Sequence, residues 1–157
     1  MSKEPDTLPP ELNEILLVED SQDDQVLTER ALRRCNAARA VVVAHDGAEA
    51  LDYLFGLGTF AGRDTSTMPD LILLDLKLPK VDGLAVLETV RNDDRTRGIP
   101  VVVLTSSDEE RDLVDSYRLG ADSYVRKTVD FSEFCDTIRL LKPQWAELST
   151  KRKRKTE

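Results

Sequence analysis

Four of the short apolar runs in this sequence are followed by side chains that could act on one ligand. They are Glu19 and Asp20 after residues 15–18, Asp75 after 71–74, Thr105 after 101–104 and Lys127 after 123–125. A single acid or hydroxyl at such a place is usually a turn residue or a helix cap. The recurrence at four runs therefore favours one shared site over four unrelated caps.

The residue types indicate which chemistry such a site would perform. Three carboxylates that lie together repel one another unless a cation sits among them, and ligation by oxygen alone favours a hard ion, Mg²⁺ above all. A carboxylate beside Mg²⁺ can attack phosphorus, while a hydroxyl and a lysine can bind the phosphoryl oxygens. Since phosphoryl transfer depends mainly on positioning and charge neutralisation, we predict that these side chains form a magnesium-dependent phosphoryl site.

The elements that would position these side chains alternate along the chain. Five apolar runs have the length and composition of buried parallel strands: Ile15–Val18, Val41–Ala44, Leu71–Leu74, Val101–Leu104 and Ser123–Val125. Helical spacing of apolar residues follows each run, over residues 22–36, 47–57, 84–93, 108–119 and 131–142. The alternation predicts an α/β fold, a five-stranded parallel sheet that is doubly wound in the flavodoxin-like order 2-1-3-4-5, with helices on both faces.

This strand order would bring distant side chains together. In an open α/β sheet, ligands bind beyond the carboxyl ends of the strands, where the strand order reverses. Here that point lies between the first strand, which Glu19 and Asp20 follow, and the third, which Asp75 follows.

The length of 157 residues fits one domain. We predict a flexible leader over residues 1–12, a single domain over 13–148 and a basic tail over 149–157.

The net charge of −8 argues against nucleic-acid binding, which needs a basic face. No apolar run approaches the roughly 20 residues of a membrane span. Only Cys35 and Cys135 are present and no secretory signal is visible, so we expect a cytoplasmic protein.

Four motifs give the chain a specific resemblance. They are ILLVED over residues 15–20, DLILLDLKLPKVDG over 70–83, PVVVLTS over 100–106 and GADSYVRK over 120–127. Over about residues 13–142 the chain resembles the response-regulator receiver domains of two-component signalling. The resemblance implies a phosphoacceptor signalling protein whose only catalysis is self-phosphotransfer and slow autodephosphorylation.

The resemblance also implies a role for each motif residue. Asp75 resembles the phosphoacceptor that takes a phosphoryl group from a histidine kinase. The residues that resemble the Mg²⁺ site are Glu19, Asp20, Asp75 and, through its carbonyl, Lys77. Thr105 and Lys127 resemble the residues that bind the phosphoryl oxygens, and Tyr124 resembles the switch aromatic, although a half-buried strand tyrosine would look the same in sequence.

Two features set this chain apart within the family pattern. Thr128 follows Lys127 where the family usually has proline, often after a cis peptide bond, which costs about 3–4 kcal/mol before other residues. Lys77 and Ser107 lie two residues after Asp75 and Thr105, at positions that tune dephosphorylation in the family.

A closer resemblance is to stand-alone receivers that are partnered with bacterial phytochromes. It implies a sensor histidine kinase as partner, with a bacteriophytochrome as the candidate kinase. It also implies that a surface of the fourth helix, fifth strand and fifth helix changes on phosphorylation. Family members commonly form homodimers through that surface.

Two other classes of function are weighed against this one. A phosphorylation-independent pseudo-receiver would share the fold, but it would not need to retain all five site residues. A magnesium-dependent hydrolase with an aspartate nucleophile would show a second aspartate two positions on, where this chain has Lys77. The only histidine, His45, has no evident partner in the sequence, so histidine-based catalysis is not expected.

Overall fold

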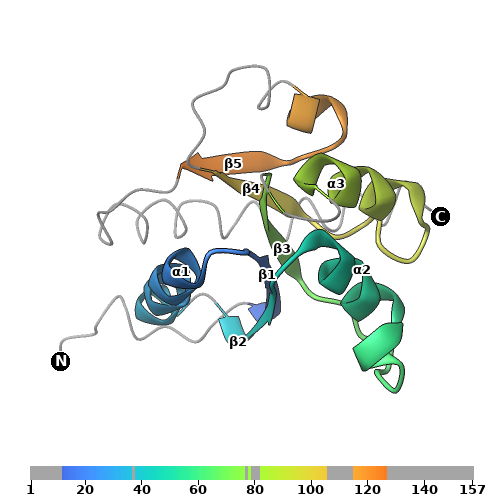
Figure 1. The fold of residues 1–157 in the computed structure, drawn as a ribbon, viewed down its shortest axis with the longest axis horizontal. Helices are drawn as coiled ribbons and strands as arrows, with labels where there is room; N and C mark the ends of the chain where they lie inside the picture. Colours follow the sequence, from blue (N-terminus) through green and yellow to red (C-terminus); the bar gives the residue numbers. More distant parts are fainter. Residues whose placement is uncertain (1–11, 37, 77, 79–81, 106–114, 127–157) are drawn as a thin grey trace, which may run out of the picture.

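The computed structural model describes residues 12–36, 38–76, 78, 82–105 and 115–126 (Figure 1). Its strands are β1 (Leu12–Val18), β2 (Ala38–Ala44), β3 (Leu71–Asp75), β4 (Val101–Thr105) and β5 (Ser123–Arg126). All pair in parallel in the order β2-β1-β3-β4-β5, which confirms the predicted topology. The helices are α1 (Gln22–Cys35), α2 (Gly47–Phe55), the short 3₁₀ helix η2 (Gly58–Phe60) and α3 (Gly83–Asn92), with a further helical segment over residues 115–118.

Helices cover both faces of this sheet. In Figure 1, α1 lies on one side of β1, while α2 and α3 lie on the other. Successive strand residues alternate between the two faces: Ile15 and Leu17 pack with Ala31 and Leu32 of α1, whereas Leu16 belongs to the core under α2 and α3. Burial on both faces explains why the strands read as continuous apolar runs.

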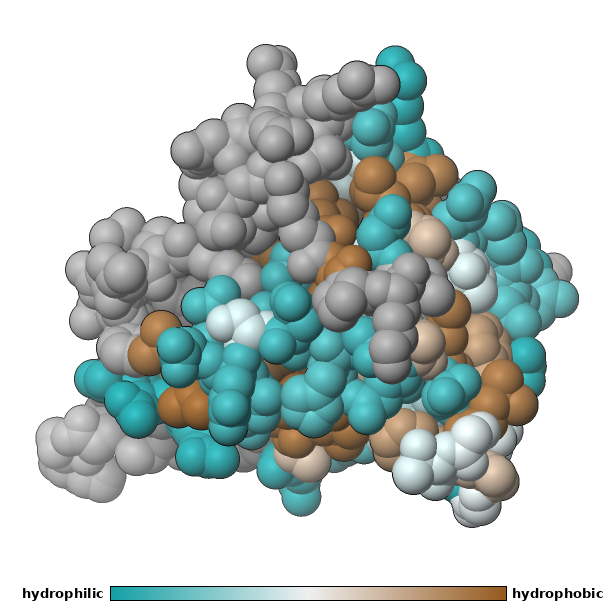
Figure 2. All heavy atoms as spheres, in the orientation of Figure 1, coloured by the Kyte–Doolittle hydropathy of each residue, from teal (hydrophilic) through white to brown (hydrophobic). Residues whose placement is uncertain are grey.

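The buried stripe of α1 differs from the one that the sequence predicts. Spacing by four residues predicts Leu27, Ala31 and Cys35, but Leu27 is 38% exposed and Thr28 is buried instead. The buried face follows residues 28, 31 and 32, a spacing of three and four that matches the helical repeat of 3.6. In Figure 2 the outer surface over α1, at the left, is mostly hydrophilic, while apolar areas show over α2 and α3.

Several predictions fall outside the described residues. These are the leader except Leu12, the basic tail, the helix over 131–142 and most of the helix over 108–119. Within the described part of the chain, no helix has the length and apolar character to cross a membrane.

Polar caps fix where the helices begin. Ser21 Oγ accepts from the Asp24 amide, Asp46 Oδ1 from the Glu49 amide and Asp82 Oδ1 from the Ala85 amide. Such caps satisfy amides that have no partner within the helix. Ser21 and Asp82 also set the direction in which α1 and α3 leave the carboxyl edge of the sheet.

The start of α3 packs directly against the end of β3. The Gly83 amide donates to the Leu76 carbonyl over 3.0 Å. A Cβ atom on Gly83 would lie 2.4 Å from the Asp75 carbonyl oxygen and 2.5 Å from the Leu76 Cα. Only glycine allows this close approach, so Gly83 holds the backbone that carries Asp75.

We therefore expect Gly83→Ala to lower the free energy of unfolding by about 1–3 kcal/mol, because the added methyl overpacks a rigid backbone contact. Gly62→Ala is the matched control, since a Cβ there meets nothing within 4 Å. Urea denaturation of the two variants checks this expectation. Equal stabilities would show that the α3–β3 contact is not tight.

A hydrogen bond between a tyrosine and a carboxylate joins α2 to β1. Tyr53 Oη donates to Glu14 Oε2 over 2.7 Å, and the Tyr53 side chain is almost fully buried. Burial first, and then the hydrogen bond to Glu14, raise the pKa of Tyr53 to about 12. The guanidinium of Arg63 stacks on the same ring, 4.2 Å from its centroid, and Arg63 Nε donates to the Tyr53 carbonyl.

The raised pKa of Tyr53 makes the free energy of unfolding depend on pH. The folded chain keeps the Tyr53 proton above the ordinary pKa of 10, where the unfolded chain loses it. The stabilisation by Tyr53 is therefore complete below pH 10 and falls as the pH rises through about 12. We expect Tyr53→Phe to be less stable by about 1.5 kcal/mol at neutral pH, and the difference from the parent chain to shrink above pH 10 in denaturation curves. A pH-independent difference would contradict this assignment.

Candidate functional site

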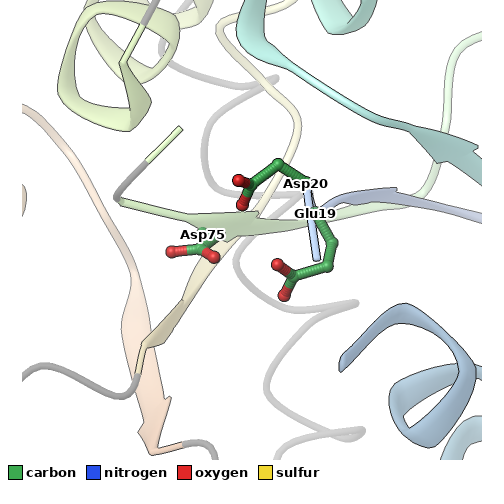
Figure 3. Close-up of side chains that lie close together, drawn as sticks. All are labelled: Glu19, Asp20 and Asp75. Atoms are coloured by element: carbon green, nitrogen blue, oxygen red, sulfur yellow. The ribbon is translucent and has the colours of Figure 1, made fainter. Parts of the chain in front are cut away.

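Three acidic side chains meet at the carboxyl edge of the sheet, as predicted. Glu19 and Asp20 follow β1, Asp75 ends β3, and one ligand atom from each lies within 4.8 Å of the others. Figure 3 shows the three carboxylates gathered around the ends of these two strands. Because β1 pairs with β3, residues far apart in sequence share one small volume.

The turn between β1 and α1 presents its two acids differently. The Glu19 amide donates to the Ala44 carbonyl of β2, and Glu19 is fully buried. Its Oε2 atom accepts from the amide of Ser21, the residue that caps α1, over 3.1 Å. Asp20 is exposed. The turn thus pairs one inward acid with one acid that solvent or a ligand can reach.

Asp75 lies deeper in the structure than Asp20. It is the last residue of β3 and is 6% exposed. The tight contact of Gly83 with its carbonyl fixes its backbone from the side of α3. Asp75 therefore has the position expected of a rigidly held reactive carboxylate.

The donor set fits a hard divalent cation. Two charges this close repel by about 3–4 kcal/mol at an effective dielectric constant of roughly 20, and two of the three acids are buried. A cation among them would offset that repulsion, and carboxylate oxygens are the ligands that Mg²⁺ and Mn²⁺ prefer. Among the described residues, this is the one acidic group with metal-site geometry.

The backbone places Thr105 at the same edge, beside the acidic group. Thr105 ends β4, and Asp75 of β3 pairs in register with Leu104, its neighbour. Thr105 pairs in turn with Arg126 of β5, the residue before Lys127. Lys77, Ser107, Lys127 and Thr128 lie outside the described residues.

Tyr124 lies on β5 and is half-buried. Its ring contacts that of Tyr117 edge-on, with centroids 6.2 Å apart and an angle of 79°. Tyr117 is 46% exposed, and burial, followed by the neighbouring Tyr124, raises the pKa of its hydroxyl. The pair therefore connects the sheet interior to the surface.

Two side-chain pairs near the sheet were not predicted from the sequence. Arg91 of α3 donates from Nη2 to Asp122 Oδ2 over 2.9 Å, and the same oxygen accepts from the Val101 amide. Both side chains are largely buried, and together they fix the starts of β4 and β5. His45 Nδ1 lies 2.9 Å from Glu49 Oε1, so the expectation that His45 has no partner was wrong. The spacing of four at a helix start was the available signal for that second pair.

The response regulator receiver domain family matches residues 15–139 of this chain. The chain therefore belongs to this family. Its members are signalling domains that bind a divalent metal and accept a phosphoryl group on an aspartate from histidine kinases.

Curated relatives cover most of the chain. The probable methanogenesis regulatory protein FilR2 of Methanothrix harundinacea is 40% identical over 131 residues, which are 83% of this chain and 82% of that protein. Response regulator Rcp1 of a Synechocystis species is 35% identical over 136 residues, 87% of this chain and 90% of that protein.

Solved structures of phytochrome response regulators are also similar. The bacteriophytochrome response regulator AtBRR is 55% identical, with a TM-score of 0.71 over 83% of this chain and 92% of that one. The phosphorylated cyanobacterial phytochrome response regulator RcpA is 38% identical, with a TM-score of 0.74 over 85% and 94%. The Mn²⁺-bound form of Rcp1 is 34% identical, with a TM-score of 0.72 over 85% and 94%.

The acidic group generates a prediction about metal binding. A cation that binds the folded chain alone stabilises it by about 2.7 kcal/mol at one hundred times its dissociation constant. We expect Mg²⁺ or Mn²⁺ to raise the free energy of unfolding, and Asp20→Asn to weaken metal binding about tenfold or more, since it removes a charged ligand.

Asp23→Asn is the matched control, because Asp23 is exposed, lies in the first turn of α1 and is outside the acidic group. Calorimetric titration of both variants with MgCl₂ checks the prediction. Equal affinities would place the metal elsewhere.

Proposed function

We propose that Asp75 is the phosphoacceptor of this receiver and that its donor is the phosphohistidine of a sensor histidine kinase. The observation that supports this most is the gathering of Glu19, Asp20 and Asp75 within 4.8 Å, at the point where the strand order reverses. An Asp75 carboxylate oxygen attacks the phosphorus as the phosphorus–nitrogen bond of the donor breaks. The imidazole of the donor keeps the electron pair of that bond.

Mg²⁺ is the cation proposed for the acidic group. When bound, it neutralises charge on the phosphoryl oxygens and on the acids. Glu19, Asp20 and Asp75 would hold it, together with the Lys77 carbonyl. The Mn²⁺-bound form of the similar Rcp1 supports a divalent ion in this role.

Thr105 and Lys127 are proposed to bind the oxygens of the phosphoryl group on Asp75. Lys77 and Ser107 are proposed to tune its slow loss by autodephosphorylation. The parallel register of β3, β4 and β5 supports the first role, because it aligns the ends of these strands.

Tyr124 is proposed to turn inward when Thr105 engages the phosphoryl group. The surface formed by the fourth helix, β5 and the fifth helix would then change, and we propose that the chain forms a homodimer through that surface.

A bacteriophytochrome is the proposed kinase class, supported by the similarity to AtBRR and RcpA. Nucleic acid is not a proposed ligand, given the net charge of −8. The proposed location of the chain is the cytoplasm.

A phosphorylation-independent pseudo-receiver is not better supported. Such a module has no need of three converging acids, two of which are buried at the cost of mutual repulsion. The acidic group therefore favours the phosphorylated receiver.

Phosphorylation is tested by intact mass after incubation with Mg²⁺ and a small acyl phosphate such as acetyl phosphate. We expect one added phosphoryl group in the parent chain and none in Asp75→Asn, because the amide is not a nucleophile toward phosphorus. Asp94→Asn is the matched control and should keep the adduct, since Asp94 is exposed and lies outside the acidic group. An adduct that persists in Asp75→Asn would exclude Asp75 as the acceptor.

The switch is tested at the Tyr117–Tyr124 pair. If Tyr124 turns inward on phosphorylation, Tyr117 loses its ring contact and becomes more exposed, so the pKa of Tyr117 should fall toward its usual value. Fluorine NMR of the fluorotyrosine-labelled chain, titrated with and without beryllofluoride, measures this change, and Tyr117→Phe assigns the signal. An unchanged Tyr117 signal in the beryllofluoride-bound chain would contradict the proposed switch.

A further inference from the structure

The β2 edge of the sheet carries a groove that the phosphoryl site does not use. The groove lies between α1 and the first half of β2 and has a volume of about 310 Å³. Leu32 and Val41 contribute apolar surface to it, and Glu29, Arg33 and Arg39 contribute charge. The acids follow the carboxyl ends of β1 and β3, whereas the groove lies at the start of the parallel strand β2. At about 3.3 Å per residue along a strand, the start of β2 lies about 20 Å from the acids. Figure 1 shows α1 and β2 together at the lower left, away from α2 and α3.

The backbone edge of β2 is open for pairing within the described part of the chain. β2 is the terminal strand of the sheet and pairs with β1 alone. Arg39 and Ala40 are exposed, and residues 41–43, all valines, are half-buried. An exposed edge with apolar alternate positions is the surface to which an extended peptide can add as a further strand.

Three exposed arginines lie on the two elements that form this groove. Arg33 and Arg34 lie in the last turn of α1 and Arg39 lies on β2, and of these Arg33 and Arg39 line the groove. The structure pairs none of them with an acid among the residues that it describes. In contrast, Arg91, Arg95 and Arg97 each have an acidic partner. The carboxylate of Glu29, the acid in the groove, accepts a hydrogen bond from Gln25 Nε2 over 3.0 Å. The patch is therefore a local positive surface on a chain with a net charge of −8.

We propose that this edge binds an extended, acidic segment of a partner protein, which adds to the sheet beside β2 and places its carboxylates against Arg33 and Arg39. A second copy of the chain is the poorer fit, because pairing two β2 edges would bring arginines against arginines. Nucleic acid is also the poorer fit, since three guanidinium groups on an acidic chain give little attraction for a long polyanion. The groove and the acidic group lie at opposite ends of the strands, so such a partner leaves the phosphoryl site open.

The test uses the full chain and a fluorescent peptide of alternating glutamate and valine residues. We expect anisotropy to report binding that weakens as salt is added, because exposed charges are screened. Arg39→Glu should weaken it at least tenfold. Arg118→Glu is the matched control: Arg118 is exposed outside the groove and its reversal changes the net charge equally. In NMR, the amides of residues 38–43 should shift on peptide addition.

Other outcomes overturn the proposal. These are equal binding of a lysine–valine peptide, equal weakening by the two variants, no binding at all, or self-association of the chain that Arg39→Glu abolishes. Asp75→Asn should bind the peptide as the parent chain does, so failure here and failure of phosphorylation at Asp75 are distinguishable.

Discussion

Mutual repulsion among three carboxylates is the constraint around which this molecule is arranged. The pairing of β1 with β3 brings Glu19, Asp20 and Asp75 within 4.8 Å, and two of these acids are buried. Such a group is unfavourable by itself, so the rest of the fold must hold it in place. Two apolar cores, one on each face of the sheet, provide that framework. A divalent cation is the ligand whose charge offsets this repulsion, and it would also offset the negative charge of a phosphoryl group on Asp75.

Specific contacts that stabilise the framework lie away from the acidic group. Arg91 and Asp122 tie α3 to the starts of β4 and β5, and the Tyr53–Glu14 hydrogen bond ties α2 to β1. Gly83 is different, because it joins the start of α3 directly to the backbone of Asp75. The amino ends of the strands therefore carry much of the specific polar bonding, and the carboxyl ends of β1 and β3 carry the acidic group. This division lets the carboxyl edge keep charges that do not stabilise the fold.

The sheet order and the acidic group could be predicted because both depend on local patterns that parallel pairing combines in one way. Apolar runs marked the strands, and the residues after them marked the site. The stripe of α1 was misassigned at Leu27, since only tertiary packing decides which neighbouring row of a helix faces the sheet. Arg91 with Asp122, and Tyr53 with Glu14, are separated by 31 and 39 residues, and no local pattern indicates such pairs. The α1–β2 groove likewise depends on how two elements pack.

We propose that the acidic group holds a divalent cation next to a phosphorylated Asp75. A crystal structure of the chain with Mn²⁺ and beryllofluoride, using anomalous scattering to locate the metal, would test this arrangement. We expect one anomalous peak bonded to carboxylate oxygens of Asp20 and Asp75, with beryllofluoride density on the other Asp75 oxygen. A metal peak away from this group, or beryllofluoride on a different side chain, would contradict it.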